Sequence, residues 1–235
     1  MDSPVTIDPD RLPEGDDKRV AVRSMFDAIA PRYDLVNRIM TFRMDVGWWR
    51  RTVRDLRLRS GALVADLACG TGDFCRELEA NGLRAIGFDL SYGMLASART
   101  SAALVEADIL RLPVPDAALD GITCGFALRN LVELPGFFDE LARVVRPGGR
   151  IALLEVAEPP NPIMRWGHSI YFGRIVPMVG GLISDAAAYQ YLPKSVAYLP
   201  APEVMLGRLA DAGFAQVDRH LLSGGIAQLI TATRI

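Results

Sequence analysis

The sequence is short of cysteine, of net charge and of long apolar runs, and each shortage excludes a class of protein. A formal net charge of -2 offers no basic surface to nucleic acid, so no nucleic-acid partner is expected. No apolar run approaches the ~18 residues that a membrane-spanning helix needs, which argues against an integral membrane protein. The three cysteines, without Cys-x-x-Cys spacing or a neighbouring histidine, are Cys69, Cys75 and Cys124. They predict neither a metal site nor a disulfide framework and are typical of a reducing compartment.

The N-terminal segment lacks the apolar core of a signal peptide, and we expect a cytoplasmic protein. Residues 1–17 contain six acids against one arginine, together with proline and glycine, which predicts a disordered arm. Half of all residues are hydrophobic, so the remaining chain, 18–235, is long enough and apolar enough to bury a core. We expect it to form a single domain.

From residue 62 onward, short apolar runs alternate with helical stretches, which is typical of parallel βα units. The expected strands are 62–68, 84–89, 102–108, 120–126 and 150–156, and the helices between them are 73–80, 91–99 and 135–145. Near the end, two apolar runs flank Ser223-Gly224-Gly225 and predict an antiparallel hairpin of 215–222 and 226–234. The predicted fold class is α/β: a seven-stranded, mostly parallel sheet with a C-terminal antiparallel hairpin and helices on both faces.

Two segments lie outside this alternation. Residues 18–58 have a helical pattern and precede the first strand. Residues 161–200 interrupt the sheet pattern before the final hairpin and carry many large apolar side chains at roughly helical spacing. Packing onto the core is one explanation of this segment, and a helical cap over an apolar substrate pocket is the other.

The stretch DLACGTGD, residues 66–73, runs from a predicted strand through a glycine turn into a helix. In an open parallel sheet, ligands bind at the carboxyl ends of the strands, which is where the turn Gly70-Thr71-Gly72 would lie. Asp89 ends the second expected strand, nineteen residues beyond Gly70, at about the spacing of a carboxylate that holds ribose hydroxyls. Strand, turn, helix and spaced acid together predict a nucleoside site.

Charge decides which nucleoside this site would bind. Asp66 precedes the turn and Asp73 begins the helix, where a pyrophosphate would need bare amide groups. Two carboxylates would repel it by a few kcal/mol at ~4 Å in a protein-like dielectric. Cys75 also stands where a dinucleotide motif has its third glycine. The acids suit S-adenosylmethionine, which has a sulfonium and an ammonium but no phosphate, although helix capping is another explanation of Asp73.

Two further residues are placed to contact the adenine of this cofactor. Met94, beyond Asp89, would flank the ring, and a core methionine is the alternative. Asp108 ends the third expected strand and would accept a hydrogen bond from the adenine amino group. An exposed acid at a strand end is the alternative for Asp108.

Five stretches in a fixed order resemble a known enzyme family: MFDAIAPRYDLVNRIMT, DLACGTGD, GFALRN, RVVRPGGRIALLE and AAYQYLPKSV. The glycine turn is common to many methyltransferases, whereas the stretches around Arg32-Tyr33-Asp34, Leu128-Arg129-Asn130 and Tyr189-Gln190-Tyr191-Leu192 are far narrower. From about residue 22 to the C-terminus, the chain resembles the class I methyltransferases and, more closely, the ubiquinone/menaquinone C-methyltransferase family (UbiE/MenG type).

The resemblance implies transfer of a methyl group from S-adenosylmethionine to a ring carbon of a prenylated quinol, such as demethylmenaquinol. By position, it implies cofactor contacts at Thr71, Asp89, Asp108 and Ile109. The chain departs from the family at Gly125, on the cofactor side, where serine is frequent, and at Ile230, where histidine is common. The first departure leaves one hydrogen bond to the cofactor open, and the second leaves the identity of the quinone open.

Methyl transfer to a ring carbon needs a group that takes or relays a phenol proton and a donor that stabilises the ring oxyanion. Arg129 and Asn130 follow the fourth expected strand, at the cofactor end of the sheet. We predict that Arg129 stabilises the oxyanion or orients a water, and that Asn130 is an orienting group. The resemblance supports both, because the family's proposed catalytic arginine falls on this motif. A structural salt bridge from Arg129 to an aspartate or glutamate is the alternative.

Four further residues are candidate substrate contacts: Tyr33, Tyr189, Tyr191 and His168. The tyrosines could hydrogen-bond the quinol oxygens, or they could be packing residues with satisfied hydroxyls. His168 is the histidine of the expected cap, and a solvated helix histidine is its alternative.

Two other functions stay open at this point. A tailoring C- or O-methyltransferase for another phenolic or polyketide ring would use the same glycine turn. A non-catalytic S-adenosylmethionine-binding subunit would not need the Arg129-Asn130 pair. A NAD-dependent oxidoreductase is disfavoured by Asp66, Asp73 and Cys75. The sequence does not decide whether the chain forms a homodimer or whether its apolar cap makes peripheral contact with a membrane.

Overall fold

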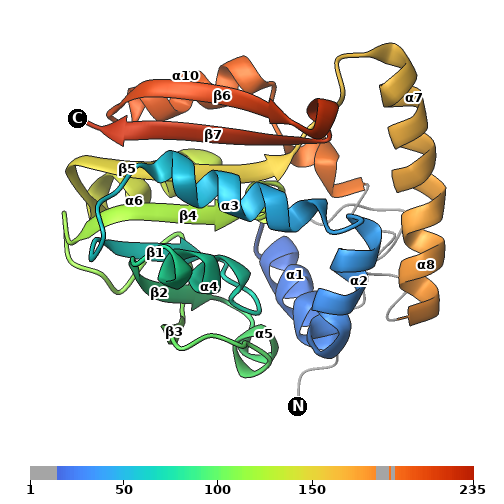
Figure 1. The fold of residues 1–235 in the computed structure, drawn as a ribbon, viewed down its shortest axis with the longest axis horizontal. Helices are drawn as coiled ribbons and strands as arrows, with labels where there is room; N and C mark the ends of the chain where they lie inside the picture. The colour runs from blue at the N-terminus through green and yellow to red at the C-terminus, as the bar shows by residue number, and fades with distance from the viewer. Residues whose placement is uncertain (1–14, 184–190, 192–193) are drawn as a thin grey trace.

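The computed structural model describes residues 15–183, 191 and 194–235, and its centre is one seven-stranded sheet (Figure 1). The strands are β1 (Leu63–Leu67), β2 (Arg84–Asp89), β3 (Ala103–Glu106), β4 (Leu119–Gly125), β5 (Val145–Val156), β6 (Phe214–Leu222) and β7 (Ala227–Arg234). Their order is β3-β2-β1-β4-β5-β7-β6. β1 to β5 pair in parallel, whereas β7 runs antiparallel to both β5 and β6. The predicted sheet and its C-terminal hairpin are confirmed.

Helices cover both faces of the sheet because successive strand residues point to opposite sides. On β5, Ile151 and Leu153 join the core cluster that holds α6 (Leu134–Val144) and α10 (Pro202–Asp211). Ala152 and Leu154, between and beyond them, join the cluster that holds α3 (Met44–Leu56) and α4 (Asp73–Ala80). A strand buried on both faces favours apolar residues at successive positions, which explains the continuous run IALL in the sequence.

The remaining helices stand at the carboxyl ends of the parallel strands (Figure 1). They are α1 (Gly15–Ile29), α2 (Tyr33–Met40), α5 (Tyr92–Ala96), α7 (Pro162–Ile170), a π-helical turn (Tyr171–Ile175) and α8 (Val176–Ile183). A third apolar cluster joins Met25 of α1, Val36 of α2, Met94 of α5 and Val176 of α8. Helices that precede the first strand and helices that follow β5 therefore pack together at the carboxyl ends of the parallel strands.

The N-terminal boundary differs from the expectation. Helix α1 begins at Gly15, so residues 15–17 of the expected disordered arm are helical, while residues 1–14 lie outside the described part of the chain. Asp16 and Asp17 stand in the first turn, where the positive end of the helix dipole favours acids. Two of the six acids that favoured a disordered arm therefore begin a helix. Within the described ranges, no helix is both long and apolar enough to cross a bilayer.

Candidate active site

The glycine turn after β1 is fastened to the end of β2 by Asp89. The amide of Gly70 donates to Oδ2 of Asp89 at 2.8 Å, and the amide of Ser91 donates to Oδ1 at 2.8 Å. Burial raises the pKa of Asp89. Each carboxylate oxygen can accept more than one hydrogen bond, so Asp89 can hold the turn and still accept from a ligand.

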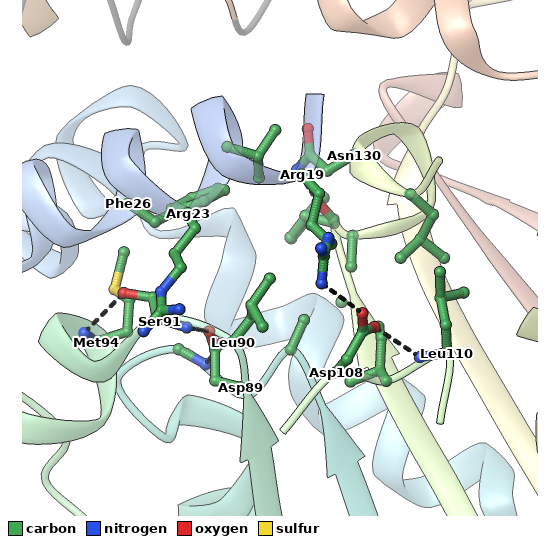
Figure 2. A pocket seen from close by; sticks show the side chains of 18 of the residues that line it. Arg19, Arg23, Phe26, Asp89, Leu90, Ser91, Met94, Asp108, Leu110 and Asn130 are labelled. Carbon is green, nitrogen blue, oxygen red and sulfur yellow. Dashed lines mark hydrogen bonds and ion pairs between the residues drawn. The ribbon is translucent and has the colours of Figure 1, made fainter. Parts of the chain in front are cut away.

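A first cavity lies over the carboxyl ends of β1, β2 and β4 and is closed by α1 (Figure 2). It brings together six of the predicted cofactor residues: Gly70, Asp89, Met94, Asp108, Ile109 and Gly125. Strand ends that are far apart in the sequence are neighbours here because parallel strands end at the same edge of a sheet. The juxtaposition that the sequence predicted is present.

Asp108 lies at the far side of this cavity and is already engaged. Its Oδ1 accepts from the amide of Leu110 at 2.9 Å, and its Oδ2 lies 3.6 Å from a guanidinium nitrogen of Arg19 (Figure 2). Arg23, one turn further along α1, forms an ion pair of 2.6 Å with Glu106. Arg19 and Arg23, which the sequence analysis did not single out, thus tie α1 across the cavity.

The structure does not support Asp66 as a cofactor contact, because Asp66 lines neither this cavity nor the second one described below. Its side chain is only 1% exposed and accepts from the Thr123 hydroxyl at 2.9 Å and from the Cys75 thiol at 3.6 Å. Burial raises the pKa of Asp66 to about 7. A strand residue that points toward its neighbours supports the turn from beneath rather than touching a ligand above it.

The turn residues Thr71 and Gly72 also differ from the simplest expectation. Thr71 is buried, and its hydroxyl donates a hydrogen bond to Asp34 of α2 at 2.5 Å. This bond connects α2 to the glycine turn. Gly72 lines neither cavity and has a φ of 83°, a left-handed conformation that suits glycine. The sequence analysis did not predict a role for Asp34 by itself. Its place in the distinctive Arg32-Tyr33-Asp34 stretch was the signal that could have led to it.

The electrostatic case against a pyrophosphate is weaker in the folded protein. Asp73 forms an ion pair with Arg76 and lies 3.8 Å from a guanidinium nitrogen of Arg38. Paired carboxylates repel an anion less than free ones do. The helix-capping alternative for Asp73 stays open, because Asp73 stands in the first turn of α4, where the helix dipole favours an acid.

A second cavity, of about 380 Å³, lies between the glycine turn, α2, α3 and α7. This volume falls within the range of small-molecule sites. Its lining is rich in aromatic and methionine side chains: Phe42, Trp48, Trp49, Phe74, Tyr171, Phe172, Met40, Met44 and Met164. An apolar, partly open cavity of this kind suits a hydrophobic ring with an apolar tail.

The two cavities share a common wall. Six residues line both of them: Phe26, Tyr33, Ala68, Gly70, Gly125 and Phe126. Gly125 matters here because a Cβ at this position would lie 2.6 Å from Cε2 of Phe74. Glycine at 125 and the Phe74 ring therefore fit together, and the departure from the family's serine has a steric counterpart. Ligands in the two cavities would meet at this wall.

Arg129 and Asn130, in the short 3-10 helix after β4, face different cavities. Arg129 lines the second cavity and is 7% exposed, and its guanidinium forms an ion pair with the fully buried Glu155 at the end of β5. Its Nε has no hydrogen-bond partner within the described residues. Asn130 lines the first cavity and its Oδ1 is likewise unpartnered. The salt bridge that was the structural alternative for Arg129 exists, and the side chain still borders the cavity.

The predicted substrate residues are only partly brought together. Tyr33 lines both cavities, and burial raises its pKa. His168 lines the second cavity, no described residue hydrogen-bonds its Nε2, and burial lowers its pKa. Tyr191 is buried in the apolar cluster around α1 and α8 and lines neither cavity, since its ring packs inward. Tyr189 lies outside the described residues.

Comparison with known proteins gives relatives along nearly the whole chain. Residues 14–234 match the model of the ubiE/COQ5 methyltransferase family. A demethylmenaquinone methyltransferase of Thermus thermophilus is 42% identical over 221 residues, covering 89% of this chain and 100% of the relative. A ubiquinone/menaquinone biosynthesis C-methyltransferase of Syntrophotalea carbinolica is 38% identical, covering 90% of this chain and 93% of the relative.

Solved structures support the fold. A SAM-dependent methyltransferase from Aquifex aeolicus superposes with a TM-score of 0.57 at 17% identity, covering 80% of this chain and 89% of that one. At this identity the likeness concerns the fold alone, and it agrees with the class I methyltransferase fold predicted from the sequence. The resemblance found in the five sequence stretches is confirmed: the chain belongs to the ubiE/COQ5 methyltransferase family.

Proposed function

We propose that the protein transfers the methyl group of S-adenosyl-L-methionine to a ring carbon of a prenylated quinol, demethylmenaquinol or a related precursor, in respiratory quinone biosynthesis. The observation that carries the proposal is the pair of cavities with a shared wall, one at the strand ends with Asp89 and Asp108 in its lining and one rich in aromatic and methionine side chains. The names of the relatives support the same chemistry. Neither the tailoring enzyme nor the non-catalytic subunit is favoured by an observation.

The methyl donor is S-adenosyl-L-methionine, in the first cavity. Asp89 accepts from the ribose hydroxyls, and Asp108 and Ile109 border the adenine together with Met94. The six residues of the common wall then hold the sulfonium end beside the second cavity. Positioning of this kind turns a reaction between two molecules into an in-line transfer within one complex.

The acceptor ring lies in the second cavity and needs electron density on carbon. When a ring hydroxyl loses its proton, the neighbouring ring carbon can form a bond to the methyl group while the sulfur takes the electrons of the breaking bond. Arg129 stabilises the ring oxyanion with its free donors, and Glu155 holds the guanidinium in place. Asn130 orients a water or the cofactor on the other side of the wall.

Peripheral membrane contact belongs to this proposal, because a prenylated substrate is taken from a bilayer. The apolar side chains of Phe42, Ile163 and Trp166 are 72%, 78% and 69% exposed. Phe42 also lines the second cavity, so the exposed apolar surface continues into the site. Co-sedimentation with lipid vesicles should fall for an Ile163→Ser/Trp166→Ser double variant, and an unchanged bound fraction would contradict this contact. The expectation of a homodimer stays a prediction.

Labelled S-adenosyl-L-methionine, offered with demethylmenaquinol, a ubiquinol precursor and simple phenols, tests the function directly. We expect label in the quinol, at carbon, with slow or no reaction of the simple phenols. Labelling of a phenol oxygen in preference to any quinol carbon would contradict the proposal and favour a tailoring O-methyltransferase.

A further inference from the structure

The buried face of α3 carries a carboxylate at its start. Asp45 is 2% exposed, and Trp48 and Thr52 follow it along the same buried face of the helix. Trp48 packs against Phe126 of the wall between the cavities, with ring centroids 6.0 Å apart. Asp45 is therefore one helical turn from a residue that touches the reaction centre of the proposed function.

One oxygen of this carboxylate has no hydrogen-bond partner among the residues that the structure describes. Oδ1 of Asp45 accepts from the amide of Val46 at 2.9 Å, whereas Oδ2 is buried without a hydrogen bond. The hydroxyl of Thr41 is also buried and lies beside Asp45, whose pKa it lowers as a hydrogen-bond donor, and both residues line the second cavity. A buried polar atom left without a partner is costly, so a carboxylate oxygen with a neighbouring hydroxyl in a cavity wall suits a ligand that supplies hydrogen-bonding groups.

No salt bridge reaches Asp45 from the residues that the structure describes. Arg38 and Arg43 act on it as charges at longer range, and His168 of α7 lines the same cavity. Burial raises the pKa of Asp45. The carboxylate thus has the environment of a proton acceptor rather than that of a structural ion pair.

We propose that Asp45 binds a ring hydroxyl of the acceptor in the second cavity and takes its proton, with Thr41 as a second hydrogen-bonding group. This inference rests on the proposed function. The proton moves to Oδ2 while the electron pair stays on the ring oxygen, and the neighbouring carbon bonds to the methyl group as the bond to sulfur breaks. The methylated carbon then loses its proton to water, and Asp45 returns its proton to the ring oxygen, so atoms and charge balance.

The other polar residues of the cavity are less suited to this step. Arg129 is paired with Glu155, and a guanidinium has donors but no acceptor, so it can stabilise an oxyanion but accept no hydrogen bond. Burial raises the pKa of Tyr33, which keeps its hydroxyl a donor. Asp73 and His168 also line this cavity, and Asp73 is ion-paired with Arg76. Both residues are intact in the Asp45 variants below, which therefore separate Asp45 from them.

The first arm of the test measures binding of a phenol and does not depend on methyl transfer. The probe is 2-naphthol, whose neutral and ionised forms differ in fluorescence emission. Asp45→Asn should bind it roughly 10–100-fold more weakly than the unaltered protein, as expected for loss of a hydrogen bond to a charged group. Thr41→Val should show a smaller loss. Equal binding by Asp45→Asn and the unaltered protein would overturn the proposal, whatever the methyl-transfer assay gives.

The second arm measures turnover with demethylmenaquinol over a range of pH. Asp45→Asn should lower turnover by about 10²–10⁴-fold, the range for a lost general base, with recovery at high pH or with a halogenated quinol of more acidic hydroxyl. The matched control is Asp55→Asn, on the same helix but paired with Arg51 at 2.5 Å, which should leave turnover and probe binding unchanged. S-adenosylhomocysteine binding and thermal unfolding confirm folding of each variant.

The outcomes separate the role of Asp45 from the assignment of a quinol as the substrate. A loss of turnover that is the same at every pH and for acidic and ordinary quinols would contradict proton transfer by Asp45. Phenol binding that depends on Asp45, in a protein that methylates none of the quinols, would support the Asp45 site while refuting the quinol assignment.

Discussion

The two cavities differ in how well their polar groups are satisfied. In the first, Asp89 and Asp108 have hydrogen bonds or ion pairs to their own protein and α1 is tied across them, while Oδ1 of Asn130 has no partner among the described residues. In the second, Arg129, Asp45 and His168 each hold a buried polar atom without a hydrogen bond among the described residues, and Asp45 has the Thr41 hydroxyl beside it. The first cavity is a preorganised site made of βα turns, whereas the second is an apolar space whose polar groups are completed by a ligand.

The largest expected effect tests this contrast at Arg129, which belongs to the second cavity. Arg129→Ala should lower turnover by about 10²–10³-fold, as for loss of one oxyanion donor. It should also lower the free energy of unfolding by about 3–5 kcal/mol, because Glu155 stays buried without its cation. S-adenosyl-L-methionine affinity, measured by calorimetry, should change little.

Two further measurements isolate the catalytic part for Arg129. Arg129→Lys should recover only part of the rate, since a point charge cannot replace a planar donor, and higher pH should partly rescue Arg129→Ala. Normal turnover per folded molecule in an unstable Arg129→Ala protein would leave only the structural salt bridge.

Asp66 lies beneath the first cavity and should make stability depend on pH. Its pKa is raised from 3.8 to about 7, so the folded state holds the proton more tightly than the unfolded state. Stability from this group is complete below about pH 4 and is lost as pH rises to about 7, a difference of roughly a few kcal/mol. Urea unfolding from pH 4 to 8 should show this fall, and Asp66→Asn should flatten it.

Asp120 is the matched control for Asp66, because its pKa is lowered by the amide of Leu63 and by Arg146. Its stabilising contribution is present at neutral pH and lost in acid, which is the opposite sign. An Asp66→Asn protein with the same slope between pH 4 and 7 as the unaltered protein would contradict the assignment.

Asp89 tests the preorganised site directly. Asp89→Ala should weaken S-adenosyl-L-methionine binding by roughly 1.5–3 kcal/mol, because ribose hydroxyls lose a charged acceptor and the glycine turn loses its anchor. Binding of 2-naphthol in the second cavity should persist. Calorimetry that shows unchanged cofactor affinity would mean that the ribose lies elsewhere.

Gly125 should give the smallest effect and sharpens the boundary between the cavities. Gly125→Ser places a Cβ against the Phe74 ring, and overpacking of this kind costs about 1–3 kcal/mol. Phe74→Leu in the same chain should restore much of the melting temperature. If Gly125→Ser alone melts like the unaltered protein, the ring moves freely and the steric pairing is wrong.

Local signals in the sequence were enough to predict the sheet, its hairpin and the edge at which the first cavity lies. Apolar runs of strand length and a glycine turn are local signals, and the rule that ligands bind where parallel strands end carries Gly70, Asp89 and Asp108 to one edge without further information. The strand places the residues that follow it directly, which is why the positions of these residues could be predicted.

Side-chain directions and contacts between distant segments could not be predicted from these local signals. That Asp66 points into the sheet, that Arg129 is paired with Glu155 and that Arg19 spans the cavity follow from side-chain directions and from contacts between distant segments. The second cavity depends on α2, α3 and α7, which come from opposite parts of the chain. Helical periodicity says which face of each helix is buried, but it does not say against what, and Asp45 acquires its meaning from that packing.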